Sequence, residues 1–210
     1  MYSAAGTIDV ATAATMAQHP EARIAIAGVS GAGKTTLAQA MSRMLDLPYT
    51  ELDSLHWGAD WTPRPQFVDD VTVLIEQPAW ITEWQYRAVR PTILDRATLL
   101  VWIDSPFPLT FARVVRRTVR RTMRSEELWN GNREPGIRHA IVHPEGIIRW
   151  AFATRKKYRH LITAAMSERP DLPVVRLRAR AHVTKLLALL DQPDRLHNSG
   201  EGDGHEPRHA

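Results

Sequence analysis

Residues 24–41 read IAIAGVSGAGKTTLAQAM, and this stretch decides the fold of the chain. A short apolar run leads into a glycine-rich turn, and Lys34 then opens a segment whose apolar residues recur at helical spacing. Residues 28–35 fit the pattern G-x-x-x-x-G-K-[ST] at every position. Backbone N–H groups can wrap around a phosphate only where side chains do not intrude, which explains the glycines. The stretch therefore predicts a strand, a phosphate-binding loop and a helix in direct succession.

The predicted ligand of this loop is a nucleoside triphosphate with Mg²⁺. In this pattern the lysine, here Lys34, reaches the β- and γ-phosphates, and the hydroxyl of Thr35 binds the metal ion. The following helix directs its positive dipole end at the anion. The residues expected to hold the nucleotide are Gly28, Ser30, Gly31, Ala32, Gly33, Lys34, Thr35 and Thr36. The alternative interpretation is a glycine-rich turn that binds no ligand.

Strands alternate with helices along the chain. The expected strands are residues 22–28, 49–53, 79–84, 98–104 and 172–178, and the expected helices are residues 34–46, 66–77, 108–124, 146–166 and 181–191. Alternation of this kind predicts an α/β fold, a parallel sheet covered by helices on both faces. Such folds bind ligands at the carboxyl ends of their strands, which is where the glycine loop lies.

The chain of 210 residues is long enough for one well-buried domain with a small mobile subdomain. We expect that domain over residues 22–191, with a flexible extension before it (1–21) and a disordered tail after it (192–210). The absence of cysteine excludes disulfides, zinc–thiolate sites and thiol catalysis. No apolar run approaches the roughly 20 residues of a membrane span, and no stretch resembles a signal peptide. We therefore expect a cytoplasmic protein with no membrane partner.

Positive charge is concentrated in one part of the chain. Residues 110–160 hold 13 arginines and lysines against 4 glutamates, a local net charge of +9, whereas the whole chain carries +4. At about 100° per residue, six arginines of the helix expected over 108–124 share an arc of about 140°. They are Arg113, Arg116, Arg117, Arg120, Arg121 and Arg124. The opposite, packed face is expected to carry Val115, Thr118, Val119, Thr122 and Met123.

Three interpretations of the arginine stripe stay open. The helix starts beside a strand end of a nucleotide fold, which favours a mobile lid around residues 113–145 whose arginines act on the triphosphate. In that case Arg113, Arg117 and Arg121 are the catalytic candidates. A second interpretation places the stripe on nucleic-acid phosphates. The third is a solvated surface partly paired with Glu126, Glu127 and Glu134.

The acceptor side of the site is expected after the second and third strands. Asp53 stands at a strand end and could accept the proton of a hydroxyl acceptor, or it could cap a helix. Arg87 and Arg90 would instead suit an acceptor that is already a phosphate. Trp57 could stack on a base or a sugar, and His56 could contact the substrate. For these two residues, ordinary packing and a structural hydrogen bond are the alternatives.

Two carboxylates are candidates for holding the water shell of Mg²⁺. Glu83 and Asp104 end the third and fourth strands, where nucleotide-binding enzymes of this kind commonly place such a group. Glu83 is slightly favoured because its strand is expected to neighbour the strand before the glycine loop. Asp104 could instead cap the helix that follows it.

Several blocks of the sequence carry a family resemblance. The stretches GVSGAGKTTLAQAMSRMLDLPYTELDSLHW, WITEWQYRAVRP, DRATLLVWIDSP, RVVRRTVRR and ELWNGNRE resemble adenylate-kinase-related P-loop proteins of the topology-modulation-like kind, over about residues 22–190. The resemblance implies a nucleoside/nucleotide-kinase type of P-loop NTPase fold with a five-stranded sheet ordered 2-3-1-4-5. It also implies ATP at residues 28–36, a lid around residues 113–140 and an acceptor pocket near Asp53, His56, Trp57 and Arg87.

One block departs from the family pattern. Relatives usually carry Asp-Gly-Asn-Tyr after the third strand, where this chain has TEWQY. Glu83 keeps a carboxylate with one more methylene, and Trp84 replaces a glycine. The floor of the acceptor pocket is therefore expected to be narrower, and the acceptor can differ from that of the relatives.

Two functional hypotheses follow. In the first, the chain is a P-loop kinase that moves the γ-phosphoryl group of ATP·Mg to a small-molecule acceptor, which can be a nucleotide, a nucleoside or a sugar-like compound. In the second, it is an ATP-binding or ATP-hydrolysing regulatory protein that acts on a macromolecule such as DNA. A GTPase would need an Asn-Lys-x-Asp stretch, and the sequence has none. The oligomeric state, monomer or homodimer, stays open.

Overall fold

The chain folds around a five-stranded parallel sheet. The computed structural model describes residues 6–124, 126–133, 151–152 and 157–192. Its strands are β1 (Arg23–Ala27), β2 (Tyr49–Thr50), β3 (Trp80–Glu83), β4 (Leu99–Ile103) and β5 (Val174–Leu177). They lie in the order β2-β3-β1-β4-β5, and every pairing is parallel. The predicted α/β class and the predicted strand order are confirmed.

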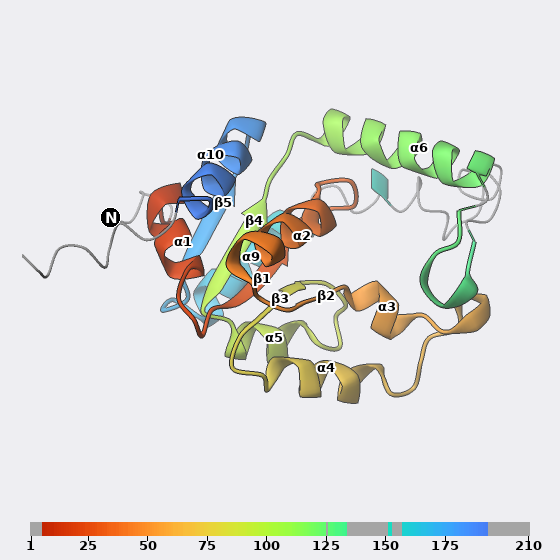
Figure 1. The fold of residues 1–210 in the computed structure, drawn as a ribbon, viewed down its shortest axis with the longest axis horizontal. Coiled ribbons are helices and arrows are strands. Elements are labelled where there is room, and N and C mark those ends of the chain that lie inside the picture. The colour runs from red at the N-terminus through yellow and green to blue at the C-terminus, as the bar shows by residue number, and fades with distance from the viewer. Residues whose placement is uncertain (1–5, 125, 134–150, 153–156, 193–210) are drawn as a thin grey trace, which may run out of the picture.

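Helices cover both faces of the sheet (Figure 1). One face packs against α1 (Val10–Ala17), α2 (Lys34–Leu45) and α10 (Arg180–Leu190), and the other against α4 (Phe67–Ile75), α5 (Arg90–Arg96) and α9 (Lys157–Glu168). Along β1 the side chains alternate, with Ile24 and Ile26 in the first core and Ala25 and Ala27 in the second. A parallel strand buried on both faces needs apolar residues throughout, which is why this run reads as continuously hydrophobic.

The described part of the N-terminal segment is folded. The prediction of a flexible extension over residues 1–21 is therefore wrong for these residues. Asp9 caps α1 by accepting a hydrogen bond from the Thr12 N–H, and the small side chains of Ala13 and Ala17 are fully buried next to α10. The N–H of Ile8 donates to the carbonyl of Val174, so the segment also extends the sheet edge. An alanine-rich stretch carries little hydrophobic signal, although alanine permits close helix packing. Residues 1–5 and residues 193–210 of the predicted tail lie outside the described part.

The region between β2 and β4 is more helical than the sequence indicated. The second strand ends at Thr50, and α3 (Leu52–His56) begins where we expected the strand to continue, so Asp53 lies in the first turn of a helix. Two 3-10 turns, η1 (Ala59–Trp61) and η2 (Trp129–Gly131), occupy parts of the chain for which no element was predicted. Helix α5 was also not predicted, since Pro91 near its start and its length of seven residues weaken the periodic signal.

The long helix α6 (Phe107–Arg124) confirms the helix predicted over 108–124. Its buried face agrees with the predicted one only in part: Thr118 is buried as predicted, but Thr110 and Val114 are also buried and Met123 is 78% exposed. The buried line lies on the same side as Arg117 and Arg121, which are half-buried. A search for an apolar face alone assigns the wrong buried face to this helix, because the side that points inward carries two arginines.

Helix α6 extends away from the sheet, and the chain then returns toward α3 (Figure 1). Residues 134–145 of the predicted lid and most of residues 146–156 of the predicted helix lie outside the described residues. Within the described ranges, no helix is both long enough and apolar enough to cross a membrane.

Candidate functional site

The glycine loop joins β1 to α2 and is in direct contact with α6. Gly31 and Gly33 have φ angles of 75° and 102°, which strongly favour glycine. A Cβ at Gly31 would lie 2.3 Å from the carbonyl oxygen of Thr110, so this glycine also permits α6 to approach the loop. At Gly33 a Cβ would meet nothing within 4 Å, so its side is open. The loop therefore has the conformation and the open space that a bound phosphate needs.

Lys34 and Thr35 both meet Glu83 at the carboxyl end of β3. The Thr35 hydroxyl donates to Glu83 Oε1 at 2.6 Å, and Lys34 Nζ lies 3.7 Å from Glu83 Oε2. Burial would lower the pKa of Lys34, but the negative charge of Glu83 opposes it, and the resulting pKa is above the ordinary lysine value. Lys34 is therefore held as a cation beside the loop.

Asp104 lies in a different environment from Glu83. Its Oδ2 accepts two hydrogen bonds from the guanidinium of Arg176, one of them 3.0 Å from Nε, and Arg159 Nε lies 3.7 Å from Oδ1. Of the two predicted metal-supporting carboxylates, the structure thus brings Glu83 to Thr35 and pairs Asp104 with arginines.

Glu51 is a site residue that the sequence analysis missed. Its Oε1 lies 3.4 Å from Thr35 Oγ1, and its Oε2 accepts a hydrogen bond of 3.0 Å from the indole N–H of Trp129. Burial raises the pKa of Glu51 above the ordinary glutamate value, and the Trp129 hydrogen bond acts in the opposite direction. The signal that could have found Glu51 is its place directly after β2, at the same sheet edge as Glu83 and the glycine loop.

Asp53 is fixed by two polar neighbours from the segment after β3. Its Oδ1 accepts hydrogen bonds from the hydroxyl of Tyr86 at 2.5 Å and from Gln85 Nε2 at 2.8 Å. Burial raises the pKa of Asp53, while the Tyr86 hydrogen bond and the positive charges of Lys34 and Arg117 reduce that increase. Gln85 and Tyr86 belong to the TEWQY block, and neither was predicted as a site residue.

The other predicted acceptor residues divide into two groups. His56 packs among aromatic rings, with centroids 4.1 Å from Tyr86 and 4.5 Å from Trp57, and burial lowers the pKa of its imidazole. Trp57 thus lies near the Asp53 cluster. Arg87 is exposed, and the guanidinium of Arg90 lies 5.6 Å from the ring centroid of Trp84. The structure therefore brings His56 and Trp57 to Asp53 and leaves Arg87 on the surface.

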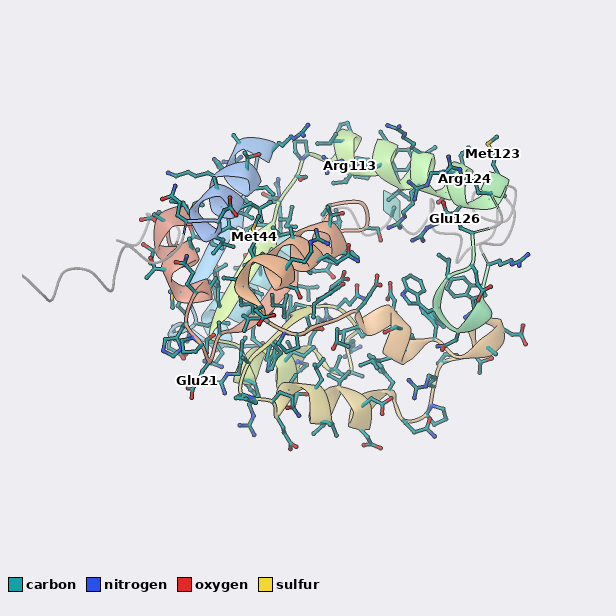
Figure 2. All side chains as sticks on the ribbon, viewed as in Figure 1. Glu21, Met44, Arg113, Met123, Arg124 and Glu126 are labelled. Atoms are coloured by element: carbon teal, nitrogen blue, oxygen red, sulfur yellow. The ribbon has the colours of Figure 1, made fainter. Side chains whose placement is uncertain are left out.

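The six predicted lid arginines also divide into two groups. Arg117 and Arg121 are half-buried on the inward face of α6, whereas Arg113, Arg116, Arg120 and Arg124 are exposed. The charge of Arg117 lowers the pKa of both Lys34 and Asp53, so its guanidinium lies within electrostatic reach of both groups. Arg121 lies 5.9 Å from the ring centroid of Trp129, and Arg113 Nη1 donates to the Ala32 carbonyl at 3.4 Å. Figure 2 shows Arg113 near the start of α6 and Met123, Arg124 and Glu126 around its far end.

Comparison with known proteins supports the fold alone. No family model and no curated protein matches the sequence. Among solved structures, a shikimate kinase from Acinetobacter baumannii in complex with shikimate is 14% identical, with a TM-score of 0.50 over 83% of this chain and 93% of that one. A gluconokinase from Sinorhizobium meliloti 1021 is 16% identical, with a TM-score of 0.46 over 81% and 91%. A sugar kinase from Janibacter sp. HTCC2649 is 18% identical, with a TM-score of 0.42 over 82% and 95%.

The likeness to the shikimate kinase agrees with a P-loop kinase fold, which the strand order and the glycine loop indicate independently. It does not bear on the narrower resemblance to adenylate-kinase-related proteins, which stays a prediction.

Proposed function

We propose that the chain is an ATP-dependent phosphotransferase that moves the γ-phosphoryl group of ATP·Mg to a hydroxyl group of a small-molecule acceptor. The observation that carries this proposal is the arrangement of Asp53. Its carboxylate is held by Tyr86 and Gln85 and is close enough to Lys34 for the two charges to affect each other. A fixed carboxylate beside a phosphate-binding lysine is what proton removal from a hydroxyl acceptor requires.

The residues present fit ATP and Mg²⁺. The glycine loop leaves open space at Gly33, and the cation of Lys34 lies next to it. The hydroxyl of Thr35 and the carboxylate of Glu83 supply the hard oxygen ligands that Mg²⁺ prefers. Within the described residues no group of three or more histidine and acidic side chains could hold a metal ion by itself. This agrees with Mg²⁺, which is usually held by one or two carboxylates together with water and substrate phosphates.

Each residue has a distinct role in this proposal. Bound ATP·Mg supplies the phosphoryl group. Asp53 takes the proton of the acceptor hydroxyl, and Tyr86 and Gln85 fix the direction of the carboxylate. Lys34 and Arg117 offset the negative charge that develops on the transferred group. Glu83 orients Thr35, and the inward face of α6 supplies Arg117.

A hydroxyl acceptor fits better than a phosphorylated one. A phosphate acceptor would need arginines that converge on Asp53 from the segment after β3, but Arg87 is exposed and Arg90 packs on Trp84. The pocket side instead presents a carboxylate, a tyrosine and an amide together with Trp57 and His56. The similar solved structures are by name kinases of small molecules, which agrees with this assignment.

The test is the release of ADP from ATP and Mg²⁺ with a panel of sugars, sugar acids, shikimate, nucleosides and nucleoside monophosphates. The proposal predicts that at least one hydroxyl compound stimulates ADP release and becomes phosphorylated, which mass spectrometry detects. The regulatory alternative predicts slow release that no acceptor stimulates, together with DNA binding that weakens as salt increases. The exposed arginines of α6 would carry that binding, and this result would refute the phosphotransferase.

A further inference from the structure

Two turns that lie far apart in the sequence have the same build. We call residues 57–63 the acceptor-side turn and residues 127–133 the lid-tip turn. In the first, the Gly58 N–H donates to the Thr62 carbonyl at 2.8 Å, and in the second, the Leu128 N–H donates to the Asn132 carbonyl at 2.7 Å. Each has a residue with a left-handed backbone at the same place, Asp60 with φ of 54° and Asn130 with φ of 56°. Each is also closed by an isolated antiparallel bridge.

Asn132 joins the two turns. Its Oδ1 accepts from the Trp61 backbone N–H at 2.8 Å, and its Nδ2 donates to the Gly58 carbonyl at 2.7 Å and to the Trp129 carbonyl at 2.8 Å. The residue is 4% exposed, so its amide is buried and its donors are fully used. A buried amide is stable only where these partners are present, since unpaired polar groups inside a protein are costly. The burial of Asn132 therefore depends on the contact between the turns.

Further contacts surround Asn132. Asn130 Nδ2 donates to the carbonyl of Trp57, and the indole N–H of Trp61 donates to the carbonyl of Arg133 at 3.0 Å. The rings of Trp61 and Trp129 meet edge to face, with centroids 6.2 Å apart. The lid arm, which we define as residues 126–133, thus returns from the far end of α6 to the acceptor side of the domain (Figure 1).

The docked lid-tip turn reaches the glycine loop through two side chains. Trp129 donates its indole N–H to Glu51 Oε2, and the other oxygen of Glu51 lies 3.4 Å from the Thr35 hydroxyl. The guanidinium of Arg121 lies over the Trp129 ring. The orientation of a carboxylate at the proposed phosphoryl-transfer site therefore depends on a residue that the lid arm supplies.

We propose that Asn132 is a positioning residue that docks the lid-tip turn onto the acceptor-side turn, and that the docked turn places Trp129 against Glu51 as part of the acceptor site. This proposal rests on the proposed function for its effect on transfer, but docking itself can be measured without turnover.

The first experiment measures docking directly. Full-length protein with ¹⁵N-labelled tryptophan is studied by NMR in the presence of Mg²⁺ and a non-hydrolysable ATP analogue, and Trp129→Phe identifies the Trp129 indole signal by its loss. Asn132→Asp replaces two donors with an acceptor that faces the carbonyls of Gly58 and Trp129. We expect the Trp129 indole proton to exchange with solvent at least about tenfold faster. The loss of one or two net hydrogen bonds changes the equilibrium between the docked and undocked turn by about this factor.

A matched control is Gln77→Glu, the same change from amide to acid at an exposed position just after α4. It should leave the exchange of the Trp129 indole proton unchanged. Asn130→Ala, which removes a second link between the turns without adding a charge, should accelerate exchange in the same direction. Unchanged exchange in both Asn132→Asp and Asn130→Ala, in proteins whose circular dichroism matches the parent, would overturn the proposal.

The second experiment measures the effect on transfer with the fastest acceptor of the panel above. Asn132→Asp should lower kcat/KM for that acceptor by about tenfold or more and change the KM for ATP by less than twofold, since it alters no residue of the glycine loop and Thr35 keeps its hydrogen bond to Glu83. Trp129→Phe keeps a ring but loses the donor to Glu51, and it should lower kcat by less than Asn132→Asp does. If Asn132→Asp lowered kcat/KM by the same factor for ATP and for the acceptor, Asn132 would have no specific role in positioning the acceptor. If docking responds as expected but no panel compound is phosphorylated, the proposed function fails while the docking role of Asn132 stands.

Discussion

The phosphate side and the acceptor side of the site differ in how their residues are spaced along the chain. The phosphate side is built mainly from residues 28–36, whose backbone conformation is set by glycines at fixed positions. The acceptor side is assembled from side chains of α3, the segment after β3 and the lid-tip turn. A site made of contiguous backbone can be found from sequence spacing, whereas a site made of dispersed side chains can be found only once the fold is known.

The largest expected effect concerns the phosphate side. Lys34→Ala should lower the rate of phosphoryl transfer by at least about 10²–10³-fold, because it removes a preorganised cation from a site where negative charge develops. Initial rates of ADP formation with the stimulating acceptor measure this effect. The matched control is Lys185→Ala, an exposed lysine of α10, which should leave the rate within about twofold. Retained transfer in a folded Lys34→Ala variant would show that the loop does not act as proposed.

The corresponding residue of the acceptor side is Asp53. Asp53→Asn should lower kcat by about 10²–10⁴-fold, the range for loss of a positioned general base, and should leave nucleotide binding within a few-fold of the parent. Calorimetric titration with ADP and Mg²⁺ separates the two properties. Asp60→Asn changes an exposed acid of the acceptor-side turn and serves as the control. A full rate in Asp53→Asn would assign the proton transfer to another group.

The pH dependence of transfer follows from the burial of Asp53. Because burial raises the pKa of this carboxyl, a proton binds it at a higher pH than it binds an exposed aspartate. The base form is therefore lost as pH falls, and the acidic limb of the kcat profile should lie above the ordinary aspartate pKa of about 3.9. Tyr86→Phe removes a hydrogen bond that lowers this pKa and should shift the limb to higher pH. A limb at or below the ordinary value, or a shift in the opposite direction, would contradict this assignment.

The same contrast explains what the sequence could predict. The strand order and the loop followed from apolar runs, glycine spacing and the family resemblance, and each depends on residues that are close together in the chain. Glu51, Tyr86 and Trp129 gave no such signal, because their chemistry arises only where the end of β2, the segment after β3 and the lid-tip turn meet. The buried face of α6 was wrongly assigned for a related reason. Arg117 comes within electrostatic reach of Asp53 and Arg121 lies over the ring of Trp129, and both of these neighbours belong to other segments of the chain.

Two adjacent arginines test which face of α6 is turned toward the site. Arg117→Ala should lower kcat by about 10–100-fold, because this half-buried guanidinium lies within electrostatic reach of Lys34 and Asp53. Arg116→Ala removes an identical, exposed group one position earlier and should change kcat by less than about twofold. Steady-state kinetics of the pair measure the difference. Equal losses would mean that the stripe acts as a diffuse positive field and not through its inward members.

The smallest effect is expected at Asp104, the carboxylate that the structure separates from Thr35. Asp104→Asn should leave the dependence of the rate on Mg²⁺ concentration unchanged, because Asp104 is hydrogen-bonded to Arg176 of β5 and not to Thr35. Glu83→Gln should raise the Mg²⁺ concentration needed for half-maximal rate several-fold, since Glu83 contacts the Thr35 hydroxyl. Asp104→Asn should instead lower the free energy of unfolding by about 1 kcal/mol, because the pair with Arg176 is partly solvated. Magnesium titrations of the two variants measure this difference. A larger Mg²⁺ requirement in Asp104→Asn than in Glu83→Gln would mean that Asp104, and not Glu83, supports the metal ion.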